Sequence, residues 1–160
     1  MTASGGTPAG GNVQAIYHTG FTVSNLERSI EFYRDWLGMV LIGQQEGQQP
    51  YLAEITGFPD VYLKTAFLKA TPDSDHILEL LEYTSHPSEP TPRETNRPGN
   101  GHICLTVRDA QAFYRDLSAR GVVFISSPVR ITSGRHEGAL ACYLRDPDGF
   151  TVELFQPPAR

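Results

Sequence analysis

Two histidines and two glutamates occupy matching places in two similar stretches of this chain. His18 begins the segment His-Thr-Gly-Phe-Thr-Val, and His102 begins His-Ile-Cys-Leu-Thr-Val. Glu79 lies within Ile-Leu-Glu-Leu-Leu, and Glu153 lies within Thr-Val-Glu-Leu-Phe. A carboxylate inside such an apolar strand is costly unless a cation meets it. Because imidazole nitrogens and carboxylate oxygens are common ligands of divalent ions, these four side chains predict a metal site.

The repetition separates this hypothesis from a purely structural interpretation. A single histidine in a strand is more often structural than a metal ligand, and a single glutamate more often faces solvent. Histidine accounts for only 5 of the 160 residues, so a second one at the matching position rarely arises by chance. A duplication can also preserve a merely structural pair. The combined pattern favours a divalent ion, with Zn, Ni, Co, Mn and Fe as candidates.

The four residues must lie on strands, where alternate side chains share a face. His18 then shares a face with Thr22, and His102 shares the matching face with Cys104. Tyr83 lies on the same face as Glu79 by the same alternation.

Each stretch predicts the order strand, helix and three further strands. The block Phe-Tyr-Arg-Asp occurs at residues 32–35 and again at 113–116, and a glycine suited to end a helix follows each block. The first helix is expected to begin at Ser24, with Glu27 completing a capping box, and the second at Asp109.

The remaining strands follow from apolar runs between turn residues. The first copy predicts strands at residues 39–42, 62–69 and 76–83. The second copy predicts a strand at 122–125 and a hairpin from 140 to 156, turned by Asp-Pro-Asp-Gly at 146–149. The predicted fold class is therefore α+β, with two βαβββ modules forming curved sheets around the metal site.

The boundaries follow from the segments that are poor in apolar residues. Residues 1–12 predict a disordered tail, 13–83 the first module, 84–100 a proline-rich linker and 101–157 the second module, all in one domain. With 13 basic and 18 acidic residues the net charge is −5, which argues against nucleic-acid binding. No apolar run approaches the roughly 18 residues of a membrane span. Two cysteines cannot build a secreted disulfide framework, so we expect a cytoplasmic protein.

The combination of motifs resembles the vicinal oxygen chelate superfamily, also known by its glyoxalase, bleomycin-resistance and dioxygenase members. The features are two His-x4-Val segments, a helix carrying Phe-Tyr, Leu-Gly, Glu-Leu-Leu and Asp-Pro-Asp-Gly-x3-Glu-Leu, spread over residues 16–156. The resemblance implies paired βαβββ modules, usually as a homodimer, and a small-molecule substrate. It also implies that His18, Glu79, His102 and Glu153 are the metal ligands.

With four protein ligands, the glyoxalase-like and epimerase-like branches fit best. The resemblance implies a lyase or isomerase that works through a metal-stabilised enediolate, with Glu153 or Glu79 moving the proton. In glyoxalase I, an arginine and an asparagine that bind glutathione stand where this chain has Thr22 and Tyr83. The resemblance therefore favours a different small acid or thioester, and these two residues are candidate substrate contacts.

Two alternatives to this function stay open. Extradiol dioxygenases bind Fe(II) and place a catalytic tyrosine ten residues before the last glutamate, where this chain has Tyr143; packing against its neighbours is the alternative role. Glu79 would fill a position that ring cleavage needs open. A non-catalytic antibiotic-binding protein is the second alternative, although such relatives usually lack the metal ligands.

The loop before the last hairpin gives a weaker hypothesis about substrate binding. Arg130 lies there with Arg135 and His136, where related enzymes gather contacts to substrate anions. A solvated surface loop explains these residues equally well.

Overall fold

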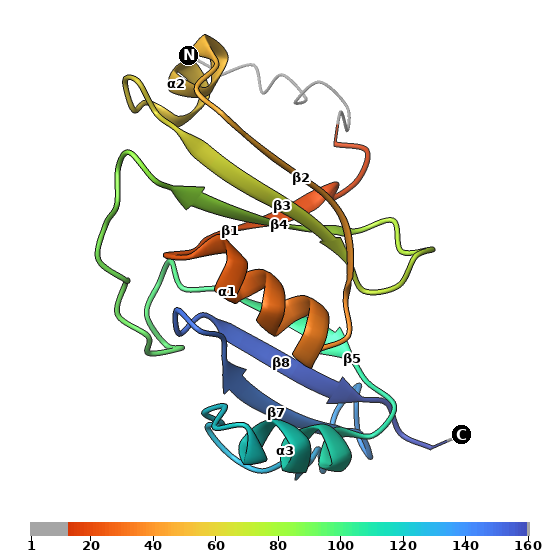
Figure 1. The fold of residues 1–160 in the computed structure, drawn as a ribbon. Helices are drawn as coiled ribbons and strands as arrows, with labels where there is room; N and C mark the ends of the chain where they lie inside the picture. The colour runs from red at the N-terminus through yellow and green to blue at the C-terminus, as the bar shows by residue number, and fades with distance from the viewer. Residues whose placement is uncertain (1–12, 160) are drawn as a thin grey trace, which may run out of the picture.

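The computed structural model describes residues 13–159 and contains two four-stranded sheets (Figure 1). The tail predicted at residues 1–12 lies outside the described residues. The first sheet has the order β1-β4-β3-β2 and the second β5-β8-β7-β6. The strands of the first sheet are β1 (His18–Thr22), β2 (Val40–Gly47), β3 (Leu63–Lys69) and β4 (Ile77–Tyr83). Those of the second are β5 (His102–Thr106), β6 (Val129–Arg130), β7 (Leu140–Arg145) and β8 (Thr151–Gln156).

The two sheets repeat one pairing scheme, which confirms the α+β fold class. In each module the first strand pairs in parallel with the last, and the last pairs antiparallel with the one before it. Gly20 is the register partner of Glu79, and Cys104 is that of Glu153. The linker at 84–100 contains neither helix nor strand.

The helix of the first module differs from the prediction at its N-terminus, whereas Gly38 follows its C-terminal end with a φ of +79°, as predicted. It comprises α1 (Leu26–Ile30) and a π-helical continuation, η1 (Glu31–Trp36). Its N-cap is Asn25, which accepts a hydrogen bond from the Arg28 backbone N–H at 2.9 Å, so the capping box at Ser24 is wrong. Ser24 instead binds Asp148, in the turn of the second module. A long-range partner has replaced the local cap.

The second module's helix, α3 (Ala110–Ala119), begins as predicted. Asp109 caps it by accepting from the Ala112 N–H at 2.9 Å. Gly121 follows the helix with a φ of +86°, a conformation that glycine adopts without strain. Of the helices in the described residues, none is long and apolar enough to cross a membrane.

Two further elements differ from the prediction. The strand expected at 122–125 is reduced to a single bridge between Phe124 and Leu144, formed by backbone hydrogen bonds of Val123 and Ile125 with β7. The chain then leaves the sheet, and β6 becomes the fourth strand. An unexpected helix, α2 (Pro50–Thr56), precedes β3. Its N-terminal proline and the left-handed Gly57 after its end are typical helix boundaries.

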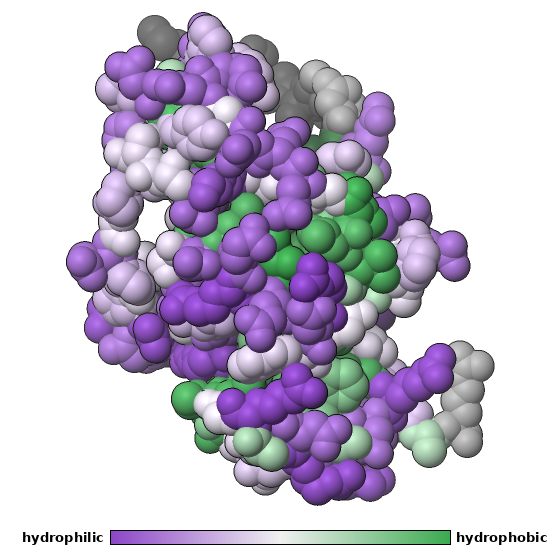
Figure 2. Space-filling view, in the orientation of Figure 1, coloured by the Kyte–Doolittle hydropathy of each residue, from purple (hydrophilic) through white to green (hydrophobic). Residues whose placement is uncertain are grey.

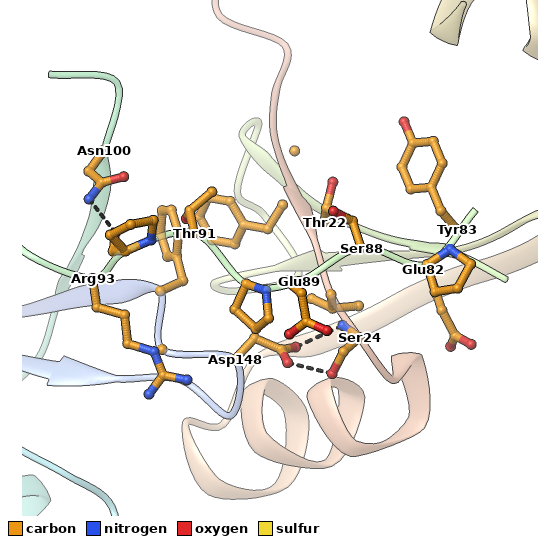
Figure 3. A pocket seen from close by; sticks show the side chains of 18 of the residues that line it. Thr22, Ser24, Glu82, Tyr83, Ser88, Glu89, Thr91, Arg93, Asn100 and Asp148 are labelled. Atoms are coloured by element: carbon orange, nitrogen blue, oxygen red, sulfur yellow. Dashed lines mark hydrogen bonds between the residues drawn. The ribbon is translucent and has the colours of Figure 1, made fainter. Parts of the chain in front are cut away.

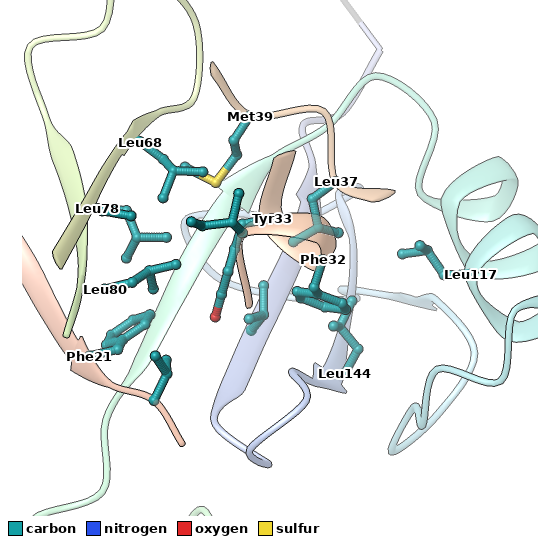
Figure 4. Close-up of a cluster of buried hydrophobic side chains, with 14 of the residues drawn as sticks. Phe21, Phe32, Tyr33, Leu37, Met39, Leu68, Leu78, Leu80, Leu117 and Leu144 are labelled. Carbon is teal, nitrogen blue, oxygen red and sulfur yellow. The ribbon is translucent and has the colours of Figure 1, made fainter. Parts of the chain in front are cut away.

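One hydrophobic core joins the two modules. In Figure 1, α1 lies between the sheets, and the buried cluster draws side chains from both (Figure 4). Tyr33 is fully buried, together with Leu80 of the first sheet and Leu154 of the second. The rings of Phe21 and Phe150, one from each module, lie 3.7 Å apart between centroids. The modules therefore share the apolar surface of a single helix.

A buried hydrogen bond crosses this core. The Tyr33 hydroxyl donates to Asp146 at 3.0 Å, and the same carboxylate accepts from the backbone N–H groups of Asp148 and Phe150. Burial raises the pKa of Asp146, and these hydrogen bonds partly oppose the rise. Burial and the neighbouring carboxylate also raise the pKa of Tyr33, so its hydroxyl remains a donor.

We predict that Tyr33→Phe lowers the free energy of unfolding by about 1–3 kcal/mol, because a buried acceptor loses its donor. The pKa of Asp146 should rise further. A carboxyl group whose pKa is higher in the folded than in the unfolded state stabilises the fold at pH values below the unfolded-state pKa. This stabilisation is lost as the pH rises through the folded-state pKa. The loss of unfolding free energy caused by Tyr33→Phe should therefore be larger at pH 7 than at pH 3, measured by denaturant titration.

The matched control is Tyr114→Phe, at the equivalent position of α3, where the hydroxyl has no hydrogen bond among the described residues. Equal losses of unfolding free energy in the two variants would contradict the prediction.

Candidate metal centre and adjoining pocket

The first predicted ligand pair forms at the edge of the first sheet. His18 Nε2 lies 3.3 Å from Glu79 Oε2, with side-chain exposures of 45% and 18%. Parallel pairing puts Gly20 opposite Glu79, and a Cβ at Gly20 would lie 3.6 Å from Glu79 Oε2. The carboxylate therefore reaches the imidazole across the position of Gly20, where a side chain would also find room.

The second pair repeats this geometry on β5 and β8. His102 Nε2 lies 3.2 Å from Glu153 Oε2, again with exposures of 45% and 18%. Cys104 takes the place of Gly20 as the register partner of the glutamate. Burial, followed by the charge of Glu153, raises the pKa of Cys104 to about 11, so the thiol stays protonated at neutral pH.

Both pairs fit a divalent ion. Two donor atoms bound about 2.1 Å from one ion lie roughly 3.0–3.4 Å apart in octahedral or tetrahedral geometry. The nitrogen-to-oxygen distances in the two pairs lie in that range. One imidazole and one carboxylate from each pair would complete a four-ligand set with a net charge that neutralises a divalent cation.

The two pairs do not join within one chain. Across residues 13–159, no group of three or more His, Cys, Asp or Glu side chains is placed to hold a metal ion. Each module thus presents half of the predicted ligand set. The expectation that His18, Glu79, His102 and Glu153 hold one ion remains a prediction, and a single chain in this arrangement supplies two separate pairs.

The second pair has protic neighbours that the first lacks. Tyr143 is the register partner of Glu153 on β7, and its ring lies 5.3 Å from that of His102. Burial and then the charge of Glu153 raise the pKa of Tyr143. At the equivalent position of β3, Glu79 faces Phe67. The pairs are thus alike in ligands and different in hydrogen-bonding surroundings.

A pocket of about 700 Å³ lies between the modules beneath the linker. Thr22 and Tyr83, the two candidate substrate contacts, both line it (Figure 3). Gly20, next to the first pair, and Gly101, next to His102, line it as well. The pocket therefore reaches the ligand-bearing strand of each module.

The other candidate substrate contacts lie outside this pocket. Arg130 is exposed on β6 and does not contribute to the lining. Tyr143 adjoins the second pair instead. The ring of His136 packs 5.1 Å from that of Phe155, so this part of the loop covers the sheet.

Sequence reasoning missed four residues that line the pocket: Phe58, His86, Arg93 and Arg145. Arg145 could have been found, because strand alternation places it on the same face as Tyr143. No local pattern marks Arg93, which the proline-rich linker brings onto the turn of the second module.

Comparisons with known proteins point to one superfamily. The family model described as Glyoxalase/Bleomycin resistance protein/Dioxygenase superfamily matches residues 15–154. Lactoylglutathione lyase GLX1 of Arabidopsis thaliana is 26% identical over 87% of this chain, which spans less than half (43%) of that relative. A lactoylglutathione lyase of Pseudomonas putida is 27% identical, covering 88% of this chain and 83% of the relative. A 2-epi-5-epi-valiolone epimerase of Actinomyces is 26% identical, covering 91% and 80%.

Solved structures share the fold. A glyoxalase family protein from Bacillus cereus superposes with a TM-score of 0.81 at 19% identity, covering 96% of this chain and all of that chain. Glyoxalase I of Leishmania major gives a TM-score of 0.61 at 23% identity, covering 89% of this chain and 86% of that one.

We predict that His102→Ala reduces retained zinc or nickel to near zero, because the second pair loses its imidazole. Metal per chain is measured by atomic emission after loading and desalting, and circular dichroism checks that the fold is kept. His76→Ala is the control, since His76 binds Thr19 and belongs to neither pair. Normal metal retention by His102→Ala would contradict the ligand assignment.

Proposed function

Because this chain belongs to the Glyoxalase/Bleomycin resistance protein/Dioxygenase superfamily, we propose that it is a metal-dependent lyase or isomerase of the glyoxalase type. The observation that carries the proposal is the repeated His–Glu pair. The nitrogen-to-oxygen distances are 3.3 and 3.2 Å, and the side-chain exposures are the same in both modules. The substrate class is a small acid or thioester with adjacent oxygen atoms. Relatives named as lyases and as an epimerase support this range of reactions.

The proposed active form is a homodimer in which two copies complete each other's sites. The first pair of one copy would meet the second pair of the other, and a two-fold axis would create two equivalent centres. An exposed aromatic side chain beside the first pair supports this arrangement. Tyr17 is 71% exposed next to His18, and its ring lies 5.7 Å from the His18 ring. A partner chain would cover it.

Within each centre, Glu153 is the proposed acid–base residue. A bound divalent ion would stabilise the negative charge that develops on substrate oxygens when a carbon-bound proton leaves. Glu153 is flanked by the thiol of Cys104 and the phenol of Tyr143, its register partners on β5 and β7, so protic groups lie beside it in either protonation state. Glu79, opposite Phe67, has no such support and would serve as a ligand alone.

A ring-cleaving dioxygenase is the second candidate, because the Tyr143 ring lies beside His102. Such chemistry would need Fe(II) and an open coordination position.

Mixing two inactive variants tests the exchange of pairs between copies. His18→Ala and His102→Ala homodimers each lack one imidazole at both centres. In a mixed dimer, centres built between copies would include one with both histidines and one with neither. Random exchange of equal amounts makes half of the dimers mixed, and each mixed dimer has one complete centre of two. We therefore predict that mixing under exchange conditions restores roughly a quarter of the wild-type metal content. If each centre forms within one chain, mixing restores nothing, and that result would refute the exchange.

The reaction class is tested with metal-loaded enzyme on hemithioacetals, methylmalonyl-CoA and catechols. We expect turnover of a hemithioacetal or thioester that a chelator abolishes and a divalent metal restores. Glu153→Gln, assayed at saturating metal, should lower kcat by roughly 10²–10⁴-fold, because a general base is lost. Glu79→Gln, the matched substitution, should lower kcat less. Turnover of catechols alone, with Fe(II), would support the dioxygenase instead.

A further inference from the structure

The pocket beneath the linker contains two guanidinium groups that the proposed proton transfer does not use. They belong to Arg145, at the end of β7, and Arg93, in the linker. Figure 2 shows the linker standing away from the body of the molecule, with an opening between them. A small molecule could therefore reach both groups from solvent.

Arg145 is half-buried and bonded only to neutral acceptors. Its Nη1 donates to the Gly149 carbonyl oxygen at 3.3 Å and to the Thr151 hydroxyl. No carboxylate among the described residues lies within ion-pair distance of it. Since a guanidinium carries five N–H donors, several remain for a further acceptor.

Arg93 lies directly on the same turn. A Cβ on Gly149 would come within 2.2 Å of Arg93 Nε and 2.5 Å of its Cζ, so only glycine allows this approach. No hydrogen bond or ion pair from the Arg93 guanidinium is found in the described part of the chain. Two cations thus converge on Gly149, a costly arrangement that an anion between them would relieve.

The acidic groups of the pocket are largely engaged elsewhere. Asp148 pairs with Arg28 at 2.7 Å and accepts from Ser24, and Glu82 accepts from the Leu26 N–H at 2.7 Å. Glu94 lies outside the pocket lining, and it is bound to Arg97 at 2.7 Å, the interaction that chiefly lowers its pKa. Glu89, which also lines the pocket, lies apart from Arg93 in Figure 3.

The opposite end of the pocket is aromatic. Phe58 contacts Tyr83 and His86, with ring centroids 5.8 and 5.1 Å apart. Figure 3 shows Tyr83 and Arg93 at opposite ends. A volume of about 700 Å³ suits a drug-sized ligand.

We propose that this pocket binds an organic carboxylate with an apolar or aromatic body. Its carboxylate would lie between Arg93 and Arg145, where guanidinium groups bind both oxygens, and its body would lie toward Phe58. This inference deepens the proposed function by naming the substrate class. Calling the ligand a substrate rests on the proposed function, whereas the binding of the carboxylate does not. The pocket borders His102 through Gly101, so a bound acid could extend toward the second ligand pair.

The test measures binding to metal-free protein by calorimetry, with 4-phenylbutyrate and its neutral isostere 4-phenylbutanamide. We expect the acid to bind at least tenfold more tightly than the amide. Arg145→Gln and Arg93→Gln should each weaken acid binding by roughly 10- to 100-fold and leave amide binding unchanged. Arg93 is exposed, so its variant tests the site without risk to folding. Arg115→Gln, an exposed residue of α3 outside the pocket, should change neither affinity.

Equal binding of acid and amide, no binding of the acid, or arginine variants that bind like the wild type would each overturn the inference. Zinc content of the same variants is measured in parallel and should stay at the wild-type level. If the wild type binds the acid but retains no metal, the proposed enzyme function fails and the carboxylate site stands.

Discussion

The parallel pairing of the first and last strands in each module determines where chemistry can occur in this protein. Because β1 pairs with β4 and β5 with β8 in the same register, each histidine at a strand start lies diagonally across from a glutamate. The glutamates lie in apolar strands and keep 18% exposure, so their charge is directed to the sheet edge, where the imidazole lies. A one-residue slip would turn each glutamate into the core, which ties the ligand geometry to the hydrophobic pattern of the strands.

The arrangement of the modules depends on a different set of contacts. The single helix α1 and its continuation η1 fill the space between the sheets, and Tyr33 and Arg28 extend from them to the Asp-Pro-Asp-Gly turn. That turn then receives Arg93 from the linker at Gly149. One four-residue turn thus joins the core, the first helix and the linker. The pocket lies where these contacts meet, so its shape follows from how the modules dock.

The features that sequence predicted are those set by local pattern. Strand alternation predicted the two His–Glu faces, and Asp109 predicted the start of α3. The prediction of Ser24 as the N-cap failed because a residue far away in the sequence determines the local structure there. Asp148 binds Ser24, and Asn25 caps α1 instead. Likewise, the separation of the two pairs and the position of Arg93 depend on module docking, which no short segment encodes. The comparisons support the superfamily, whereas the ligand roles stay predictions.

The two halves of the duplication have diverged in a direction that fits a division of labour. Gly20 and Phe67 surround Glu79, while Cys104 and Tyr143 occupy the same positions around Glu153. Apart from His18, 3.3 Å away, the neighbours of Glu79 on the adjacent strands carry no polar side chain. A thiol and a phenol can reorient as Glu153 gains or loses a proton. If both carboxylates were ligands only, the second module would gain nothing from a thiol and a phenol beside Glu153.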